Sequence, residues 1–398
     1  MERIEKRNCP ICDHYNNEIL FSQEFVDIKE VTFLRGYEVV VCNNCGFLYA
    51  DDIPGQKEFD LYYKNCSKYE VKADELTDSQ ISRFQASLNF IEECINNEEI
   101  NFEKFRIVDI GCATGDFLRF LKGKGYQDLN GIDPSPLCVK LMKDNHINAK
   151  QATINELEEH EKYDFIRLNA VLEHVVDLNY SITQLKKILN KGGYLYLSVP
   201  NVQGFKELVN CPFQEFSVEH INYFSKNSLS NLMRKHGFTL IDYQINHNKL
   251  YSELETIFRY DDDVTKKNEK IVDDQEAIES IKEYIVRNYR LEREVNEKIK
   301  SRIQEQEPII VWGVGTHTLR QLAKGQLRKC NIKLFVDSNL HYQNKQYNGI
   351  PIISPEQLYE YNYKILISSY YGQDSIVDYI NKVLKLNNEI VTLYNVEN

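Results

Sequence analysis

The sequence has no apolar run of about 18 residues, the length that a helix needs to cross a bilayer. Its first residues, Met1–Glu5, also lack the apolar core of a signal peptide. No block of basic residues stands out, and 48 basic against 60 acidic side chains give a formal net charge of −12. These absences argue against a nucleic-acid or anionic-membrane partner. We therefore expect a cytoplasmic protein.

The size and composition allow two or three domains, because the chain has 398 residues of which 42% are apolar. Disulfides are not expected in the reducing cytosol, so paired cysteines among the ten in the chain indicate a metal site instead.

Two CxxC pairs near the N-terminus have the spacing of a metal knuckle. Four thiolates favour tetrahedral zinc and leave no open coordination position. The pattern predicts a structural zinc site made by Cys9, Cys12, Cys42 and Cys45, with Val31–Val41 as a strand pair that returns the second CxxC to the first. Four unrelated buried cysteines or a redox dithiol are the alternatives.

The most informative segment is Arg106–Asp116, where an apolar strand runs into the glycine-rich turn Gly111–Gly115. A second strand, Leu129–Asp133, ends in an acid. Backbone N–H groups approach a ligand at such a turn, and the acid takes the two ribose hydroxyls of an adenosine. This pair of features predicts a nucleoside-binding site.

Strand and helix patterns alternate around this segment, which predicts an α/β domain with a mostly parallel sheet covered on both faces. Ligands then bind at the carboxyl ends of the strands, where Asp109, Asp133 and Asn169 fall. Lys191–Gly193 is expected to be a turn. The expected elements are helix Ile81–Cys94, strand Ile107–Ile110, helix Phe117–Leu121, strand Leu129–Asp133, helix Leu137–Asp144, strand Tyr163–Leu168, helix Ile182–Leu189 and strand Tyr194–Val199.

Two residues distinguish the possible nucleotides. Ala113 stands where a dinucleotide fold has the middle glycine of G-x-G-x-x-G. Asp109 precedes the turn, suits a cationic amino-acid ligand and would repel pyrophosphate. Over about residues 80–240 the chain resembles the class I S-adenosylmethionine-dependent methyltransferases, through Val108–Gly115, Asp133 and Phe165–His174.

The resemblance implies a Rossmann-like fold, an S-adenosylmethionine cofactor and a set of residues that bind it. That set is Asp109, Gly111, Ala113, Gly115, Asp133, Pro134, Thr153 and Asn169, with Thr153 and Ala152 near the adenine. An NAD-binding Rossmann domain is the alternative.

Methyl transfer needs an aligned acceptor and a group that removes its proton, and histidine suits that task near neutral pH. His220 is the candidate base, with a structural hydrogen-bonding role as its rival, and Glu219 beside it is expected to be an orienting or solvated carboxylate rather than a base. His174 is expected to orient the cofactor pocket. Both Glu219 and His220 are expected after the last strand of the sheet, and Ser225 should cap a helix at Leu229–Lys235.

Nearly the whole chain, more weakly at its C-terminus, resembles the zinc-binding sugar C-methyltransferases of deoxysugar pathways, in which a Tyr-x-Glu-His pattern flanks the sugar. Here Ser217 replaces the tyrosine, while Glu219 and His220 remain. The resemblance implies C- or O-methylation of a sugar, nucleotide-linked, in glycan or natural-product synthesis.

The C-terminal third has a second strand and turn, Ile309–Thr316, and an acid at Asp337. This pattern predicts a smaller Rossmann-like unit, with helix Pro355–Tyr359 and strand Lys364–Ser368. The resemblance to the sugar methyltransferases implies that this unit helps to hold the nucleotide-sugar substrate, and a structural domain that buries the long helices is the alternative. Thr316 and His317 are expected to meet phosphates there, and Tyr62, Tyr63 and Tyr69 to cover the cofactor.

The expected domains are a zinc-binding unit at 1–70, a methyltransferase domain at 71–250, a helical linker at 251–306 and the substrate-binding unit at 307–398. The linker forms long helices that pack on the chain's own domains or make a coiled-coil dimer, so the protein is a monomer or homodimer. Two functional alternatives stay open. One is an NAD-dependent sugar-nucleotide reductase that uses the C-terminal unit, and the other is a non-enzymatic zinc-ribbon binding module.

Overall fold

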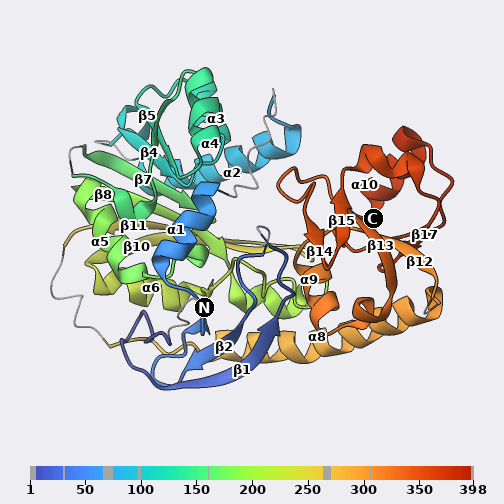
Figure 1. Cartoon of the computed structure of the whole chain (residues 1–398). Helices are drawn as coiled ribbons and strands as arrows, with labels where there is room; N and C mark the ends of the chain where they lie inside the picture. Colours follow the sequence, from blue (N-terminus) through green and yellow to red (C-terminus); the bar gives the residue numbers. More distant parts are fainter. Residues whose placement is uncertain are drawn as a thin grey trace.

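Three sheets organise the computed structural model, which describes residues 6–29, 32–65, 75–96, 100–159, 161–262, 270–304 and 306–395. They have four, seven and six strands and lie in the N-terminal, middle and C-terminal parts of the chain (Figure 1). None of the helices within these ranges is long and apolar enough to cross a membrane.

The N-terminal sheet has the order β1-β2-β3-β9. The predicted strand pair at Val31–Val41 is wrong, because β2 pairs with an earlier strand and Val31 lies outside the described residues. Gly36 allows the close approach of these two strands, since a Cβ there would lie 2.3 Å from the carbonyl oxygen of Gln23. The strands are β1 (Asn17–Glu24), β2 (Gly36–Cys42), β3 (Leu48–Asp51) and β9 (Asn222–Tyr223), and helix α1 (Gln56–Asn65) follows β3.

The middle sheet has the order β10-β11-β8-β7-β4-β5-β6, and its last five strands are parallel. The predicted α/β alternation is confirmed, and apolar clusters fill both faces of the sheet. The strands are β4 (Ile107–Ile110), β5 (Leu129–Asp133), β6 (Asn148–Gln151), β7 (Tyr163–Asn169), β8 (Leu189–Pro200), β10 (Phe238–His247) and β11 (Ser252–Tyr260). The helices are α2 (Asp78–Ile95), α3 (Asp116–Lys124), α4 (Pro136–Asp144), α5 (Leu178–Ile188) and α6 (Lys226–Lys235), the last capped by Ser225 as expected.

Three expectations about this sheet are wrong. Lys191–Gly193 lies inside β8, where the register with β7 shifts, rather than in a turn. The segment with Glu219 and His220 does not follow the last strand, because β10 and β11 come later and extend the sheet as an antiparallel hairpin. Residues 252–260 therefore belong to the sheet and not to a helical linker.

Strand β11 was not predicted from the sequence because it contains acidic residues. Glu255 is buried, yet its carboxylate accepts hydrogen bonds from Ser87, Gln244 and Asn246, and Ser198 donates to Glu253. A charged side chain tolerates burial when its oxygens are satisfied in this way.

One long helix, α8 (Gln275–Arg302), leads from the middle sheet to the C-terminal sheet and runs beneath the C-terminal sheet (Figure 1). Its buried residues share an apolar cluster with Val39 of β2 and Val311 of β12, so it packs on the chain's own domains. The C-terminal sheet has the order β14-β15-β13-β12-β16-β17, and the predicted helix at Pro355–Tyr359 is a 3-10 helix over Pro355–Glu360. Its elements are β12 (Pro308–Trp312), α9 (Thr316–Ala323), β13 (Asn331–Val336), β14 (Gln346–Tyr347), β15 (Ile350–Ile353), β16 (Lys364–Ile367), α10 (Gln373–Asp378) and β17 (Ile390–Thr392).

Candidate functional site

The turn between β4 and α3 adopts a backbone that needs residues without bulk. Gly111 and Gly115 have φ angles of +71° and +77°, in the left-handed region. A Cβ on Gly111 would lie 2.6 Å from Cγ2 of Val171, so a larger residue would also displace the segment after β7. Ala113 has a φ of +50° in the same turn. The turn therefore exposes backbone rather than side chains to the space above it.

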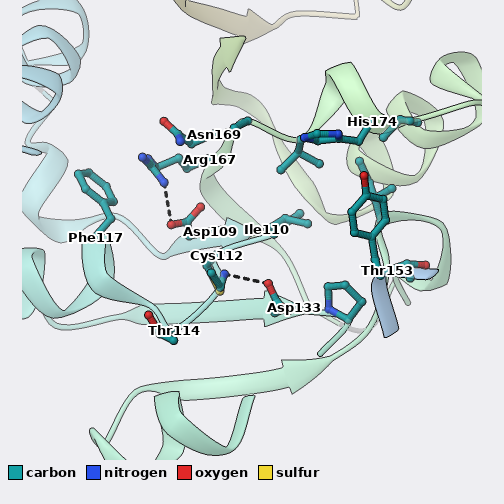
Figure 2. Close-up of a pocket in the computed structure, with 18 of the residues that line it drawn as sticks. Asp109, Ile110, Cys112, Thr114, Phe117, Asp133, Thr153, Arg167, Asn169 and His174 are labelled. Atoms are coloured by element: carbon teal, nitrogen blue, oxygen red, sulfur yellow. Dashed lines mark hydrogen bonds and ion pairs between the residues drawn. The ribbon is translucent and has the colours of Figure 1, made fainter. Parts of the chain in front are cut away.

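Asp133 is held in place by two backbone N–H groups. Ala113 donates to its Oδ2 at 2.8 Å, and Ser135 donates to its Oδ1 at 2.9 Å. Figure 2 shows the carboxylate beside the glycine-rich turn. These two bonds fix the acid at the tip of β5, in the orientation expected of a ribose-binding carboxylate.

Asp109 is paired with a cation that the sequence analysis missed. Arg167 on β7 lies 2.9 Å from Asp109 Oδ2, with side-chain exposures of 7% and 2% (Figure 2). The guanidinium also lies 4.1 Å from the centroid of the Phe117 ring. Burial raises the pKa of Asp109, and Arg167 opposes that rise. Within the described residues, Asp109 Oδ1 has no hydrogen-bond partner, so one oxygen remains for a cationic donor.

A cavity of about 480 Å³ lies over these residues at the carboxyl ends of the strands. Seven of the eight predicted cofactor residues line it: Asp109, Gly111, Ala113, Asp133, Pro134, Thr153 and Asn169, together with Ala152. Gly115 instead precedes the first residue of α3. The cavity offers a ligand the Oδ1 of Asp109 that is unpartnered within the described ranges, the fixed carboxylate of Asp133 and the exposed backbone of the glycine-rich turn. These three features fit an adenosine that carries an amino acid.

One rim of this cavity, formed by His174 and Glu219, carries one of the two predicted catalytic residues, and His220 lies next to that rim without lining the cavity itself. Glu219 lines the cavity and accepts a hydrogen bond from the Tyr62 hydroxyl at 2.7 Å. His174 Nδ1 lies 3.0 Å from the Glu219 carbonyl oxygen, and the rings of His174 and His220 lie 5.0 Å apart. The Ser217 hydroxyl accepts the N–H groups of Glu219 and His220 and so holds their turn.

Of the three tyrosines predicted to cover the cofactor, two lie in the described part of the chain. Tyr63 lines the cavity, Tyr62 reaches Glu219, and Tyr69 lies outside the described residues.

Comparison with known proteins agrees with this geometry. Residues 80–243 match the family model described as Methyltransferase domain. This part of the chain is an S-adenosylmethionine-dependent methyltransferase domain. Residues 305–391 match a second model, described as C2185-like, N-terminal.

Curated relatives of the methyltransferase domain are tRNA U34 carboxymethyltransferases. The protein of Wolinella succinogenes is 30% identical over 145 residues, which cover 34% of this chain and 52% of the relative. The protein of Nautilia profundicola is 25% identical over 175 residues, which cover 42% of this chain and 57% of the relative. The chain thus spans about half the length of these relatives, and its resemblance to sugar methyltransferases stays a prediction.

Solved structures that this chain matches include the N-methyltransferase NodS of Bradyrhizobium japonicum in complex with S-adenosyl-L-homocysteine. That match has a TM-score of 0.38 at 16% identity and covers 50% of this chain and 97% of the other. The magnesium protoporphyrin IX methyltransferase of Synechocystis with the same bound molecule gives a TM-score of 0.38 at 13% identity, over 50% of this chain and 97% of the other.

The four cysteines of the knuckle meet beside the methyltransferase domain. All four sulfurs of Cys9, Cys12, Cys42 and Cys45 lie within 4.8 Å of one another. The Cys9–Cys45 and Cys12–Cys42 sulfur distances are 3.4 and 3.5 Å. Tetrahedral zinc with bonds of about 2.3 Å holds sulfurs about 3.8 Å apart, so the group fits a structural zinc.

Arg7 connects this knuckle to the catalytic rim. It is buried, and its guanidinium donates to the carbonyl oxygens of Ala50 and Val176 and to the side chain of Asn222. A weaker contact of 3.4 Å reaches the carbonyl of Ile221, next to His220. This role could not be predicted from the sequence, because the partners of Arg7 lie far apart along the chain.

A second cavity, of about 820 Å³, lies in the C-terminal unit. Asp337 at the end of β13 accepts hydrogen bonds from the N–H groups of Val314 and Asn339 at 2.7 and 2.8 Å, the same arrangement as at Asp133. Thr316 and His317 line this cavity. The ring nitrogens of His317 contact the hydroxyls of Ser368 and Tyr394, and its expected contact with phosphates stays a prediction.

His317 makes the stability of the C-terminal unit depend on pH. Burial, with Arg320 nearby, lowers the pKa of His317 from 6.5 to about 4. Because the folded state binds this proton less readily than the unfolded chain, the stabilisation is complete above pH 6.5 and is lost as the pH falls toward 4. The loss amounts to about 3 kcal/mol. Urea unfolding at about pH 7 and pH 4.5 should show a smaller pH dependence for His317→Gln than for the unchanged protein. An equal dependence in the two proteins would contradict the assignment.

Proposed function

We propose that this protein transfers the methyl group of S-adenosylmethionine to carbon or oxygen of a sugar, most simply a nucleotide-linked one. The observation that carries the proposal is the first cavity, which joins the cofactor residues to a rim with Glu219. The knuckle contributes a structural zinc that supports the fold.

In this proposal the acids of the cavity hold the cofactor, which supplies an electrophilic methyl carbon when bound. Asp133 takes the ribose hydroxyls, and Asp109 Oδ1 accepts from the amino group of the methionine part. The Arg167 cation keeps the Asp109 carboxylate from adding a full negative charge to the site. The polar contacts therefore favour a zwitterionic amino acid over a pyrophosphate.

The rim residues are placed to handle the acceptor. His220 and Glu219 are the groups that can take the acceptor proton, and Tyr62 orients the Glu219 carboxylate. The Ser217 hydroxyl already accepts two backbone N–H groups, so it is committed to holding the turn. Methylation of an acidic carbon needs a group that stabilises the enolate, and position 217 has no tyrosine to do so. A sugar hydroxyl is therefore as suitable an acceptor as an acidic carbon.

The second cavity supports a substrate with two parts. Cys211 and Gln214 line that cavity, and Glu219, a few residues later in the same segment, lines the first. A substrate whose nucleotide end lies near Asp337 would be guided by this segment toward the methyl donor.

The Asp133→Asn variant tests the cofactor site. Losing one charged acceptor of two ribose hydroxyls should weaken S-adenosylmethionine binding by roughly 10–100-fold, as for other hydrogen bonds to charged groups. Calorimetric titration measures this, with Asp144→Asn at the exposed end of α4 as the matched control. Equal affinity in both variants would remove Asp133 from the site.

The substrate is tested by methyl transfer to sugar nucleotides and to tRNA from labelled S-adenosylmethionine. Transfer to a sugar supports the proposal. The curated relatives make tRNA the second candidate, against which stands the formal charge of −12. Transfer to tRNA alone, or binding of NADH without S-adenosylmethionine in calorimetry, would overturn the proposal. Mass spectrometry of the purified protein for a bound sugar nucleotide provides an independent check.

A further inference from the structure

Three potential metal ligands meet at the catalytic rim, apart from the four-cysteine knuckle. Glu173, His174 and His220 each present one ligand atom, and these atoms lie within 4.8 Å of one another. Glu173 Oε1 lies 3.9 Å from His174 Nε2. The three residues come from two segments, one after β7 and one before β9, which the fold brings together.

The orientation of His174 is that of a metal ligand. Its Nδ1 lies 3.0 Å from the carbonyl oxygen of Glu219, a group that can only accept, so Nδ1 carries the hydrogen. The lone pair is then on Nε2, which faces Glu173. Metal-binding histidines almost always donate their second nitrogen to a carbonyl or carboxylate in this way.

Glu173 provides a second and independent observation. Its side chain is 1% exposed, and its Oε2 has no hydrogen-bond partner among the described residues. A buried carboxylate oxygen without a partner is costly unless a ligand satisfies it. The Glu173 carboxylate belongs to the same cluster as the two imidazoles, so one cation can contact all three side chains.

We propose that Glu173, His174 and His220 bind a divalent transition-metal ion that holds the acceptor oxygen of the substrate. Imidazole and carboxylate ligands together suit such ions, and three protein ligands leave positions open for substrate. This site differs from the knuckle, where four thiolates close the coordination sphere. The inference rests on the proposed methyl transfer and applies to a hydroxyl acceptor.

The bound ion changes the role of His220. As a ligand it no longer accepts a proton, and the ion instead lowers the pKa of the acceptor hydroxyl. The hydroxyl proton passes to Glu219 at the rim. The oxygen then forms its bond to the methyl carbon, and the carbon–sulfur bond breaks with its electron pair retained by sulfur.

Binding of Mn²⁺ alone, followed by electron paramagnetic resonance on the zinc-loaded full chain, tests the site. Mn²⁺ prefers oxygen and nitrogen ligands, so it discriminates against the thiolate knuckle. One Mn²⁺ should bind per chain, and Glu173→Gln and His220→Asn should each weaken that binding at least 10-fold. His146→Asn, an exposed position outside the cavity, should bind as the unchanged protein does.

Calorimetry with S-adenosylmethionine separates the two proposals. Both rim variants should keep cofactor affinity within about 2-fold, which shows that they are folded. Equal Mn²⁺ binding by the unchanged protein and both variants, or its absence from all of them, would overturn the metal site and leave methyl transfer standing. If a chelator that leaves the knuckle zinc in place does not lower the rate of methyl transfer, that result would also overturn the metal site. Failure to bind S-adenosylmethionine would instead overturn the proposed function.

Discussion

Replacing His220 with alanine is expected to lower kcat by about 10²–10⁴-fold, the range typical of losing a positioned proton acceptor. The imidazole lies 5.0 Å from the ring of His174, which lines the cofactor cavity. The affinity for S-adenosylmethionine should stay near normal, because none of the predicted cofactor contacts involves this residue. Initial rates of methyl transfer with a sugar-nucleotide acceptor, together with calorimetry, measure both quantities.

The matched control is His146→Asn, which changes an exposed histidine in the turn before β6. Asparagine tolerates the φ of +57° found there, so this variant should be fully active. An unchanged rate in His220→Ala would remove that residue from the mechanism, whether as base or as ligand. The pH profile distinguishes these two roles. If His220 is the base, kcat changes with pH as its imidazole ionises. If His220 is a metal ligand, kcat depends on added metal.

Replacing Cys42 with serine is expected to destabilise folding rather than chemistry. Zinc bound by four thiolates contributes its binding free energy directly to folding, and this contribution is several kcal/mol or more. The Cys42 sulfur lies 3.5 Å from that of Cys12, within the cluster, so the variant should lose zinc and unfold at lower urea concentration. Elemental analysis and urea unfolding of the purified protein measure the two effects.

Cys330→Ser is the control for this change, because Cys330 is a partly buried cysteine far from the knuckle. It should retain one zinc per chain and a nearly normal unfolding midpoint. A Cys42→Ser protein that lacks metal yet unfolds like the unchanged chain would contradict a structural role for the knuckle.

The sequence predicts the local parts of the cofactor site well, because these depend on short-range patterns. The strand at Ile107–Ile110, the glycine-rich turn and the acid at Asp133 each have a signature of a few residues, and the structure brings them together as expected. Parallel strands joined by helices place such signatures at one edge of the sheet.

Contacts between distant segments were not predictable in the same way. The Tyr62–Glu219 and Arg7–Val176 hydrogen bonds join residues more than 150 positions apart, and no periodicity of the sequence indicates them. Arg167 did carry a signal, since it is a charged residue in the apolar strand Tyr163–Asn169, and such a residue requires a buried partner.

Strand β11 was missed for a different reason. Its acidic residues broke the apolar alternation that identifies strands, and their charge is tolerated only because polar side chains from neighbouring elements surround them. The strand propensity of one segment cannot show that side chains from other segments will satisfy its buried acidic residues.

The pairing of β3 with β9 has a consequence for the order in which the protein is made. Leu48 pairs with Tyr223, so the edge of the first sheet stays open while the intervening residues are still being synthesised on the ribosome. An exposed strand edge can associate with other chains. We therefore expect nascent chains that stop before Tyr223 to depend on chaperones, and the knuckle, although it comes first in the sequence, to reach its final packing only after the catalytic segment has emerged.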